Sequence, residues 1–218
     1  MKMIYAPFVH AAGNAAVLFL FCSSLALTMQ PALAGFDEAA AAFAAGDYNK
    51  TLQQSRPLAE KGDPRSQYAM GVLYENGLAV TKDLKLAAAW YLKAAKQGNA
   101  DAQYNLGAMY EHGVGMPVNY AEAARWYRPA AEQGDIDALS NLGVLYQNGQ
   151  GVPQDKVLAM ALYNVSVAYA GRGTTQAAQN RQVLANQMSL DEVKKALALT
   201  ETLLKPGNLK PGLRTYPK

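Results

Sequence analysis

Cysteine and histidine are almost missing from this 218-residue chain, which has one Cys and two His. Cys22 and His10 both lie within the first 34 residues, which have the character of a leader. The remainder can form no disulfide and offers no thiol for catalysis, and His112 is its only imidazole. Zinc sites need several such ligands, so we expect neither a metal nor a cofactor.

No charge of one sign dominates. Twenty Lys and Arg residues face 17 Asp and Glu, for a net charge of +3, and half of the residues are apolar. Nucleic-acid-binding proteins present clustered basic residues, and the repeated part of the sequence has no such cluster, so we expect no nucleic-acid partner. The apolar content is too high for a disordered chain. Abundant Ala and Leu with few β-branched runs favour an all-helical protein.

A long hydrophobic run is also missing. The apolar stretch from Ala15 to Leu27 is too short, and too rich in serine at its end, for a membrane span of about 20 residues. It follows Lys2 and precedes Ala32-Leu33-Ala34, an order typical of secretory signal peptides. We predict a signal peptide over 1–34, cleaved after Ala34, and a periplasmic or secreted protein without stable membrane insertion. A retained anchor is the alternative.

What the chain does have is a period of 36 residues. Two glycine positions and two tyrosine positions repeat at that step: Gly71, Gly107 and Gly143; Gly77, Gly113 and Gly149; Tyr74, Tyr110 and Tyr146; Tyr91, Tyr127 and Tyr163. Small and aromatic residues at constant offsets are typical of stacked helix pairs. Each pair buries its apolar surface only against its neighbours, so stability should come from stacking.

Cap residues divide the sequence. First helices are predicted over Pro64–Asn76, Ala100–His112 and Ile136–Asn148, each ended by a glycine suited to a left-handed turn. Second helices should begin near Asp83, Asn119 and Asp155. We predict a partial capping repeat over 35–63, full repeats over 64–99, 100–135 and 136–172, capping helices over 173–205 and a flexible Pro/Gly-rich tail over 206–218.

Two further pairs of residues recur at equivalent positions. Pro57 and Pro129 fall inside predicted second helices, where a proline either kinks the helix or breaks it. Asn105 and Asn141 precede a helix leucine and form either a functional polar pair or, as we expect, hydrogen bonds to neighbouring backbone.

The second unit reads A-x-x-x-L-G-x-x-Y-x-x-G, then a loop of about six residues, then A-x-x-W-Y-x-x-A-A-x-x-G. This pattern resembles the Sel-one-like repeats (SLR), relatives of the tetratricopeptide repeat with a longer loop. The resemblance covers about residues 36–172. It departs from the pattern at Ala79, where later copies have glycine, and at Leu162 and Ala170 in the third copy. It implies an all-α protein, a right-handed α-solenoid of antiparallel helix pairs.

The resemblance also implies a non-catalytic adaptor or regulator that binds another protein or peptide. A secreted factor acting on host or neighbouring cells is the alternative. Some secreted relatives have been connected with β-lactam binding, which makes a hydrolase the remote alternative. The S-x-x-K nucleophile pair of such enzymes is absent, because Leu, Ala, Gly, Tyr and Glu stand three residues after Ser55, Ser66, Ser140, Ser166 and Ser189. We expect no enzyme.

By analogy with tetratricopeptide arrays, the first helices should line the concave face. Tyr68 and Tyr104 are the preferred anchors, because tyrosine supplies contact area at little entropic cost. The alternative is an ordinary solvated face with tyrosines packed sideways between units. The mildly acidic character of this concave face predicts a partner segment with basic and apolar residues. We expect the protein itself to be a monomer. The candidate partner-binding residues are Arg65, Tyr68, Val72, Glu75, Asp101, Tyr104, Ala108, Glu111, Asp137, Ser140, Val144 and Gln147.

Overall fold

The computed structural model describes residues 30–171 and 175–216, and every regular element in these two ranges is a helix. The predicted signal peptide lies for the most part outside the described residues. The helices are α1 (Gln30–Ala44), α2 (Tyr48–Glu60), α3 (Pro64–Asn76), α4 (Leu84–Lys96), α5 (Ala100–His112), α6 (Tyr120–Glu132), α7 (Ile136–Asn148), α8 (Lys156–Ala170), α9 (Gln176–Ala185), α10 (Leu190–Leu204) and α11 (Leu209–Thr215).

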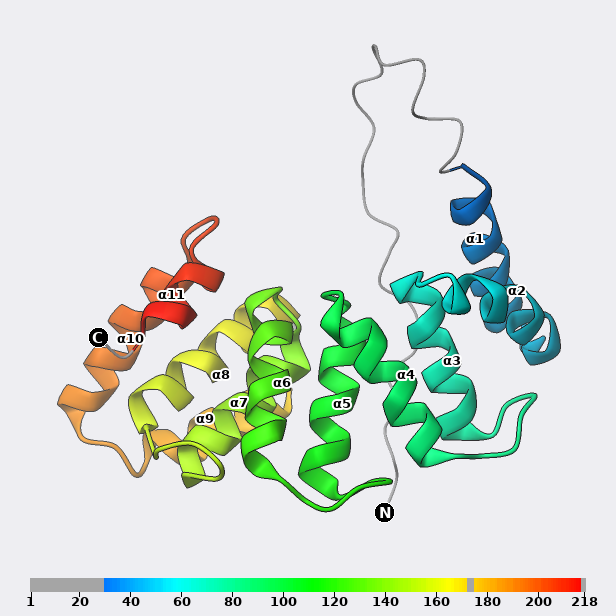
Figure 1. Ribbon diagram of the computed structural model, residues 1–218. Coiled ribbons are helices and arrows are strands. Elements are labelled where there is room, and N and C mark those ends of the chain that lie inside the picture. The colour runs from blue at the N-terminus through cyan, green and yellow to red at the C-terminus, as the bar shows by residue number, and fades with distance from the viewer. Residues whose placement is uncertain (1–29, 172–174, 217–218) are drawn as a thin grey trace, which may run out of the picture.

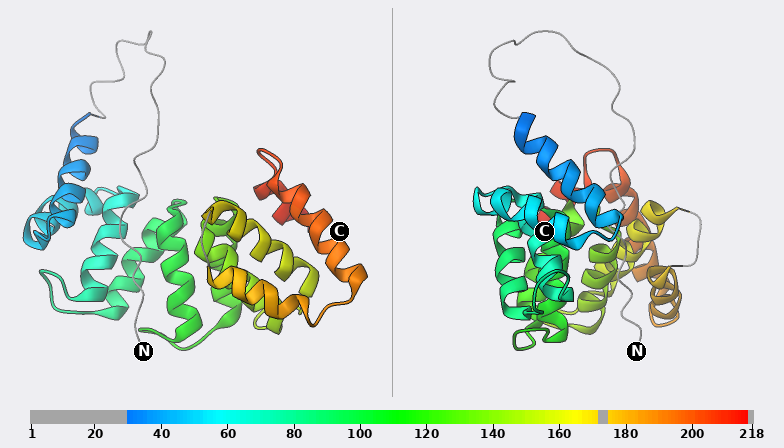
Figure 2. Two further views of the ribbon diagram at one scale, coloured as in Figure 1. Left: turned by 180° about the vertical axis from the view of Figure 1, so that it is seen from behind. Right: turned by 90° about the vertical axis from the view of Figure 1, so that its right-hand side faces the viewer.

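The helices stack in chain order. From α1 to α9 each helix packs against the next one, and α10 packs against α8. Figure 1 shows the resulting curved row, with α1 and α2 at one end and α10 and α11 at the other, and Figure 2 gives two further views of it. The predicted solenoid of helix pairs is confirmed. No helix in the described part of the chain is long and apolar enough to cross a membrane.

The boundaries of the first helices follow from their caps. The side chains of Asp63, Asn99 and Asp135 each accept a hydrogen bond from the backbone N–H three residues later, at 2.7–2.8 Å. At the other end Gly77, Gly113 and Gly149 adopt φ of 67–69°, a left-handed conformation that glycine reaches without strain. The predicted bounds of α3, α5 and α7 are confirmed to the residue.

Within each unit a glycine of the first helix faces a tyrosine ring of the second. Tyr91, Tyr127 and Tyr163 are fully buried. Their rings fill the space that a side chain at the facing glycine would need: a Cβ on Gly107 would lie 2.7 Å from Tyr127, and one on Gly143 would lie 2.7 Å from Tyr163. This glycine lets two helices approach closely, which explains why it recurs in helix interiors despite its poor helix propensity.

The recurring tyrosines near the ends of the first helices also pack inward. Tyr146 is 7% exposed, and Tyr74 and Tyr110 are partly buried against the core clusters of neighbouring units. The units therefore share one continuous apolar interior, as expected for a stacked array.

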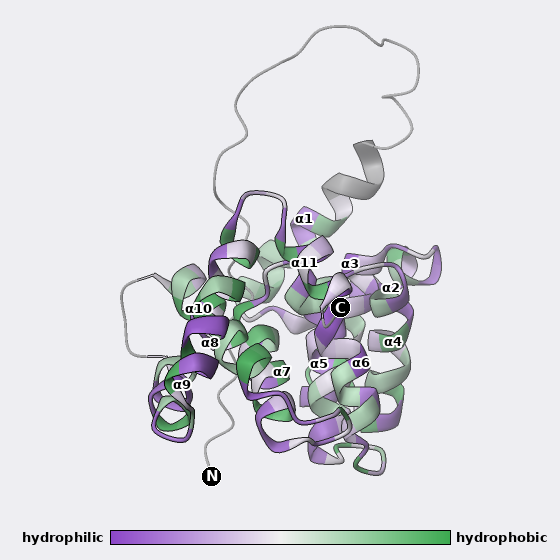
Figure 3. Cartoon of the chain, turned by 90° about the vertical axis from the view of Figure 1, so that its left-hand side faces the viewer, coloured by the Kyte–Doolittle hydropathy of each residue, from purple (hydrophilic) through white to green (hydrophobic). Residues whose placement is uncertain are grey.

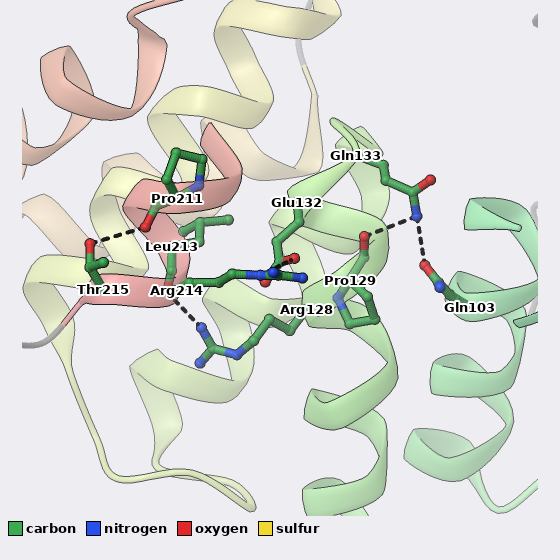
Figure 4. Close-up of polar contacts among 9 residues, drawn as sticks. All are labelled: Gln103, Arg128, Pro129, Glu132, Gln133, Pro211, Leu213, Arg214 and Thr215. Atoms are coloured by element: carbon green, nitrogen blue, oxygen red, sulfur yellow. Dashed lines mark hydrogen bonds and ion pairs between the residues drawn. The ribbon is translucent and has the colours of Figure 1, made fainter. Parts of the chain in front are cut away.

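In each of the first two full units, a pair of glutamines forms hydrogen bonds that reach the preceding unit. The Gln133 side chain donates to the Gln103 side chain at 2.8 Å (Figure 4). Gln103 donates in turn to the carbonyl oxygen of Ala95 in the preceding unit at 3.0 Å. Gln97, Gln67 and Ala59 repeat this arrangement one unit earlier. Since Gln103 is buried, these bonds satisfy polar groups that water cannot reach.

The long loops connect neighbouring units. A Cβ on Gly115 would lie 2.8 Å from Leu84, at the start of α4 in the preceding unit. Gly151 lies in the same way against Tyr120 and Ala121 at the start of α6. Ala79 holds the equivalent left-handed conformation, at φ 56°, without being glycine. The loop conformation is therefore common to all three units.

Both internal prolines lie within unbroken helices. α2 runs through Pro57 and α6 runs through Pro129. The carbonyl oxygen of Pro129 accepts a hydrogen bond from the Gln133 side chain at 3.1 Å. The alternative that these prolines end their helices is wrong.

At the N-terminal end, α1 begins at Gln30. The helix therefore crosses the predicted cleavage point between Ala34 and Gly35. Cleavage there would leave the part of α1 that carries the buried residues Ala39 and Ala42.

At the C-terminal end the prediction of a flexible tail is wrong. Leu209 and Leu213 of α11 are buried in the main core cluster, four residues apart and so on one face of a helix. Arg214 forms an ion pair with Glu132 of α6 at 3.0 Å, and Arg128 donates to the carbonyl oxygen of Leu213 at 3.0 Å (Figure 4). The proline and glycine content suggested mobility, whereas two leucines and two ion-paired or hydrogen-bonded arginines anchor the segment.

Candidate functional site on the first helices

The second helix of each unit reaches the first helix through a tyrosine hydroxyl. Tyr91 donates to Glu75 and Tyr127 donates to Glu111, each at 2.6 Å, and Tyr163 donates to Gln147 at 2.8 Å. Burial, followed by the neighbouring carboxylate, raises the pKa of Tyr91 and of Tyr127. Three predicted partner-binding residues, Glu75, Glu111 and Gln147, are therefore also structural acceptors.

Tyr68 and Tyr104 lie against these buried tyrosines. The ring centroid of Tyr68 is 5.7 Å from that of Tyr91, and the ring centroid of Tyr104 is 5.8 Å from that of Tyr127. Both side chains are partly buried, and burial raises the pKa of Tyr104 to about 12. Each ring thus packs against the buried tyrosine of the second helix in its own unit, and only part of each ring is open to a partner.

The repeated asparagines bond to side chains rather than to backbone, so the sequence-based expectation is wrong. Asn141 of α7 donates to the hydroxyl of Tyr127 at 3.2 Å. Asn105 of α5, one unit earlier, hydrogen-bonds to Tyr68 and Tyr91. Each asparagine comes from the unit after its tyrosine, so these bonds join adjacent units. Their spacing of 36 residues was the available signal, but the sequence did not show which group they face.

Carboxylates gather beside the two partly exposed tyrosines. The charged groups with the largest effect on the pKa of Tyr68 and Tyr104 are all acidic: Glu75, Asp101, Glu111, Asp135 and Asp137. Asp101 and Asp137 are exposed. We call Tyr68, Tyr104 and the five carboxylates together the first-helix face. No group of His, Cys, Asp or Glu side chains in the described ranges is arranged to hold a metal ion.

Asp135 is the member of this face that sequence reasoning missed. In the sequence it is simply the N-cap of α7, equivalent to Asp63 and Asn99. In the fold, burial raises its pKa to about 6, the backbone N–H of Ala138 opposes that shift, and the nearby carboxylates of Asp137 and Asp101 add to it. Asp135 therefore caps α7 and also adds a carboxylate to the first-helix face.

The other predicted partner-binding residues are less accessible to a partner. Arg65 stacks on the ring of Phe36 at 4.2 Å and lies 3.7 Å from Asp63, which places it toward the N-terminal end. Ser140 is only 7% exposed, so little of it is available to a partner. Three more pack against the core clusters and are partly buried: Val72, Ala108 and Val144.

Comparisons with known proteins agree with the repeat and the fold. The family model described as "Sel1 repeat" matches residues 64–99, 100–135 and 136–166. None of the curated proteins matches the chain. A solved Sel1 repeat protein from Oxalobacter formigenes has a TM-score of 0.63 and 30% sequence identity, over 78% of this chain and 70% of that one.

A second solved structure is a protective antigen present in uropathogenic Escherichia coli strains, which displays an SLR fold. Its TM-score is 0.60 and its sequence identity 25%, over 85% of this chain. The present chain spans 44% of that protein's length. With the repeat model, the helix pairs and the Oxalobacter formigenes structure in agreement, this chain belongs to the Sel1 repeat family.

Proposed function

We propose that this protein is a non-catalytic adaptor that binds a segment of a partner protein along its first-helix face, on the concave side of the solenoid. Sel1 repeat proteins generally act as scaffolds for protein interactions. The family gives the kind of function, and the chemistry of this face gives the kind of partner.

One observation supports this choice of surface most strongly, namely the gathering of carboxylates around partly buried aromatic rings. Asp101 and Asp137 are exposed beside Tyr68 and Tyr104. Aromatic rings held by neighbours lose little entropy on binding, and carboxylates favour Lys or Arg. A partner segment that alternates basic with apolar residues fits both features.

The proposed setting is the periplasm, reached through cleavage after Ala34. The basic start, the apolar run and the Ala-Leu-Ala site support this setting. Amino-terminal sequencing of the protein purified from its own cells tests it. A mature chain that starts at Gly35 is the expected result, and an uncleaved Met1 terminus would contradict it.

The binding proposal is tested with a library of random 12-residue peptides displayed on phage. We expect enrichment of peptides that combine Lys or Arg with aliphatic residues. The double substitution D101K/D137K should weaken binding of an enriched peptide at least tenfold, because it reverses two exposed charges. A control is D191K, which makes one such charge reversal at an exposed position of α10 and should leave peptide binding unchanged.

Loss of folding must be separated from loss of binding. Tyr68 and Tyr104 pack on buried tyrosines, so their replacement by Ala also removes packing. The charge-reversal variants act at exposed positions and are therefore the primary test, with the thermal midpoint as the measure of folding. Equal peptide affinity of D101K/D137K and D191K would remove the first-helix face as the binding surface.

A secreted factor acting on other cells is the second candidate. The observation that favours it is the similarity to a protective antigen of uropathogenic Escherichia coli. Fractionation of the producing cells distinguishes the two, because an adaptor should remain with the periplasm and a secreted factor should be found in the medium.

A further inference from the structure

The last long helix of the solenoid carries a row of exposed leucines. Leu190, Leu197 and Leu204 of α10 are 70%, 55% and 37% exposed, and we call them the leucine row. They are seven residues apart, so they lie in line along one face of the helix. The adjacent side of α10, about a quarter of a turn around the helix, packs into the core through Ala196, Thr200 and Leu203. Figure 3 looks onto this end of the molecule.

Such a face is unusual at the end of a solenoid. A terminal capping helix is expected to be polar on its outer side, because no further unit covers it. The other end meets this expectation, since the exposed residues of α1 include Asp37 and Glu38. The leucine row is therefore an apolar surface that we expect another molecule to cover.

The charges within the row indicate which occupant fits. Lys194 lies between the first two leucines and Glu201 lies between the last two, and both are exposed. The row thus reads Leu, Lys, Leu, Glu, Leu along the helix. If two copies of this row ran antiparallel, leucine would lie opposite leucine and lysine would lie close to glutamate.

We propose that a second copy of this chain covers the leucine row, with the two α10 helices antiparallel about a two-fold axis at Leu197. In this arrangement Leu197 meets its own equivalent and Leu190 lies opposite Leu204. Lys194 lies beside Glu201 of the second copy, and the symmetry makes the same pair twice. A two-fold interface of this kind uses the same patch on both subunits and closes after two copies.

This arrangement revises the expectation of a monomer. The buried surface would be limited to one helix pair, at the small end of protein interfaces. The dimer should therefore dissociate on dilution. The inference does not depend on the proposed peptide-binding function, because α10 contributes nothing to the first-helix face.

Charge exchange is the sharpest test. K194E places two acidic side chains together at both ends of the interface, and E201K places two basic side chains together there. Each variant alone should be a monomer at concentrations where the wild type is dimeric, with a dissociation constant raised at least tenfold. An equimolar mixture of K194E and E201K should form a heterodimer, because each unlike pair is restored across the axis.

Sedimentation equilibrium over a range of concentrations measures these states. The control K195E makes the same charge change on the neighbouring exposed residue, which lies away from the row, and should leave the dimer intact. L197E places two like charges on the axis and should give a monomer that still binds the enriched peptides. A wild type that is monomeric at all concentrations, a mixture that does not associate, or assembly beyond the dimer would overturn the proposal.

Discussion

Gly107 of α5 and Tyr127 of α6 are in direct contact across the two helices of the second full unit. Tyr127 is fully buried, and a Cβ on Gly107 would lie 2.7 Å from its Cδ1 atom. Equivalent pairs occur in the units on either side. Glycine at this position is therefore a requirement of helix packing rather than of backbone conformation.

The substitution Gly107→Ala should destabilise the protein by about 1–3 kcal/mol, because the ring of Tyr127 has no free space into which to move. Urea unfolding followed by circular dichroism measures the change. In a Tyr127→Leu background the same substitution should cost less, since the ring is gone. Equal costs in the two backgrounds would show that the contact does not control the packing.

Removing the hydroxyl of Tyr127 leaves Glu111 and Asn141 without this partner. Tyr127→Phe should therefore destabilise the fold by about 1–2 kcal/mol, as is usual for a part-buried hydrogen bond whose other groups remain. Glu111→Gln should cost no more than about 0.5 kcal/mol, because Gln147 accepts the same bond from Tyr163 in the third unit. The order of the two variants in urea unfolding tests this directly, and a larger loss for Glu111→Gln would contradict it.

Gly151 has both a left-handed backbone and a close neighbour, the start of α6. Gly151→Ala should cost about 3 kcal/mol, since backbone strain and the contact with Tyr120 and Ala121 add together. Gly98 is the matched control, with φ of 92° and open space around its missing Cβ. Gly98→Ala should cost only the strain, about 1 kcal/mol. Similar costs at both positions would mean that the loop does not hold adjacent units together.

The partly buried cap Asp135 should make stability depend on pH. Its folded pKa of about 6 lies above the value of about 3.9 expected in the unfolded chain. The folded state therefore binds more protons between these values, so this group favours folding at pH 4 and loses that contribution as the pH rises through 6.

Asp135→Asn should remove this contribution and keep the cap, because Asn99 fills the same position one unit earlier. We expect the variant to gain stability relative to wild type at pH 7.5 and to lose that advantage near pH 4.5. Thermal midpoints across this range measure the effect. A constant difference at every pH would show that Asp135 does not titrate as its surroundings indicate.

The C-terminal helix should contribute to the stability of the whole array. The helix α11 contacts both α10 and α6, and its Leu213 is buried in the main core cluster. Leu213→Ala should cost about 2–4 kcal/mol, as for other buried leucines. Lys210→Ala, on the exposed side of the same helix, should change stability by less than about 0.5 kcal/mol. Equal effects would mean that α11 is not docked in solution.

Local signals explain what could be predicted from the sequence. Asp63 and Gly77 bound α3 through contacts within a few residues of themselves, so the chain alone predicted both ends of the helix. The effect of Pro57 and Pro129 was harder to predict, because packing against neighbouring units decides whether the helix continues through a proline. The short helix α11 was missed because its leucines form a core only with residues far away in the chain.

The sequence by itself determined the family, the period and the stacked helix pairs, because these depend on residue spacing that any stretch of the chain carries locally. Only the tertiary structure decided which side chains remain available. It enclosed Ser140, turned Tyr68 and Tyr104 against buried rings, brought Asp135 beside Asp101 and left the leucine row of α10 uncovered. These outcomes depend on contacts between units, and spacing along one chain does not specify the direction in which a side chain points.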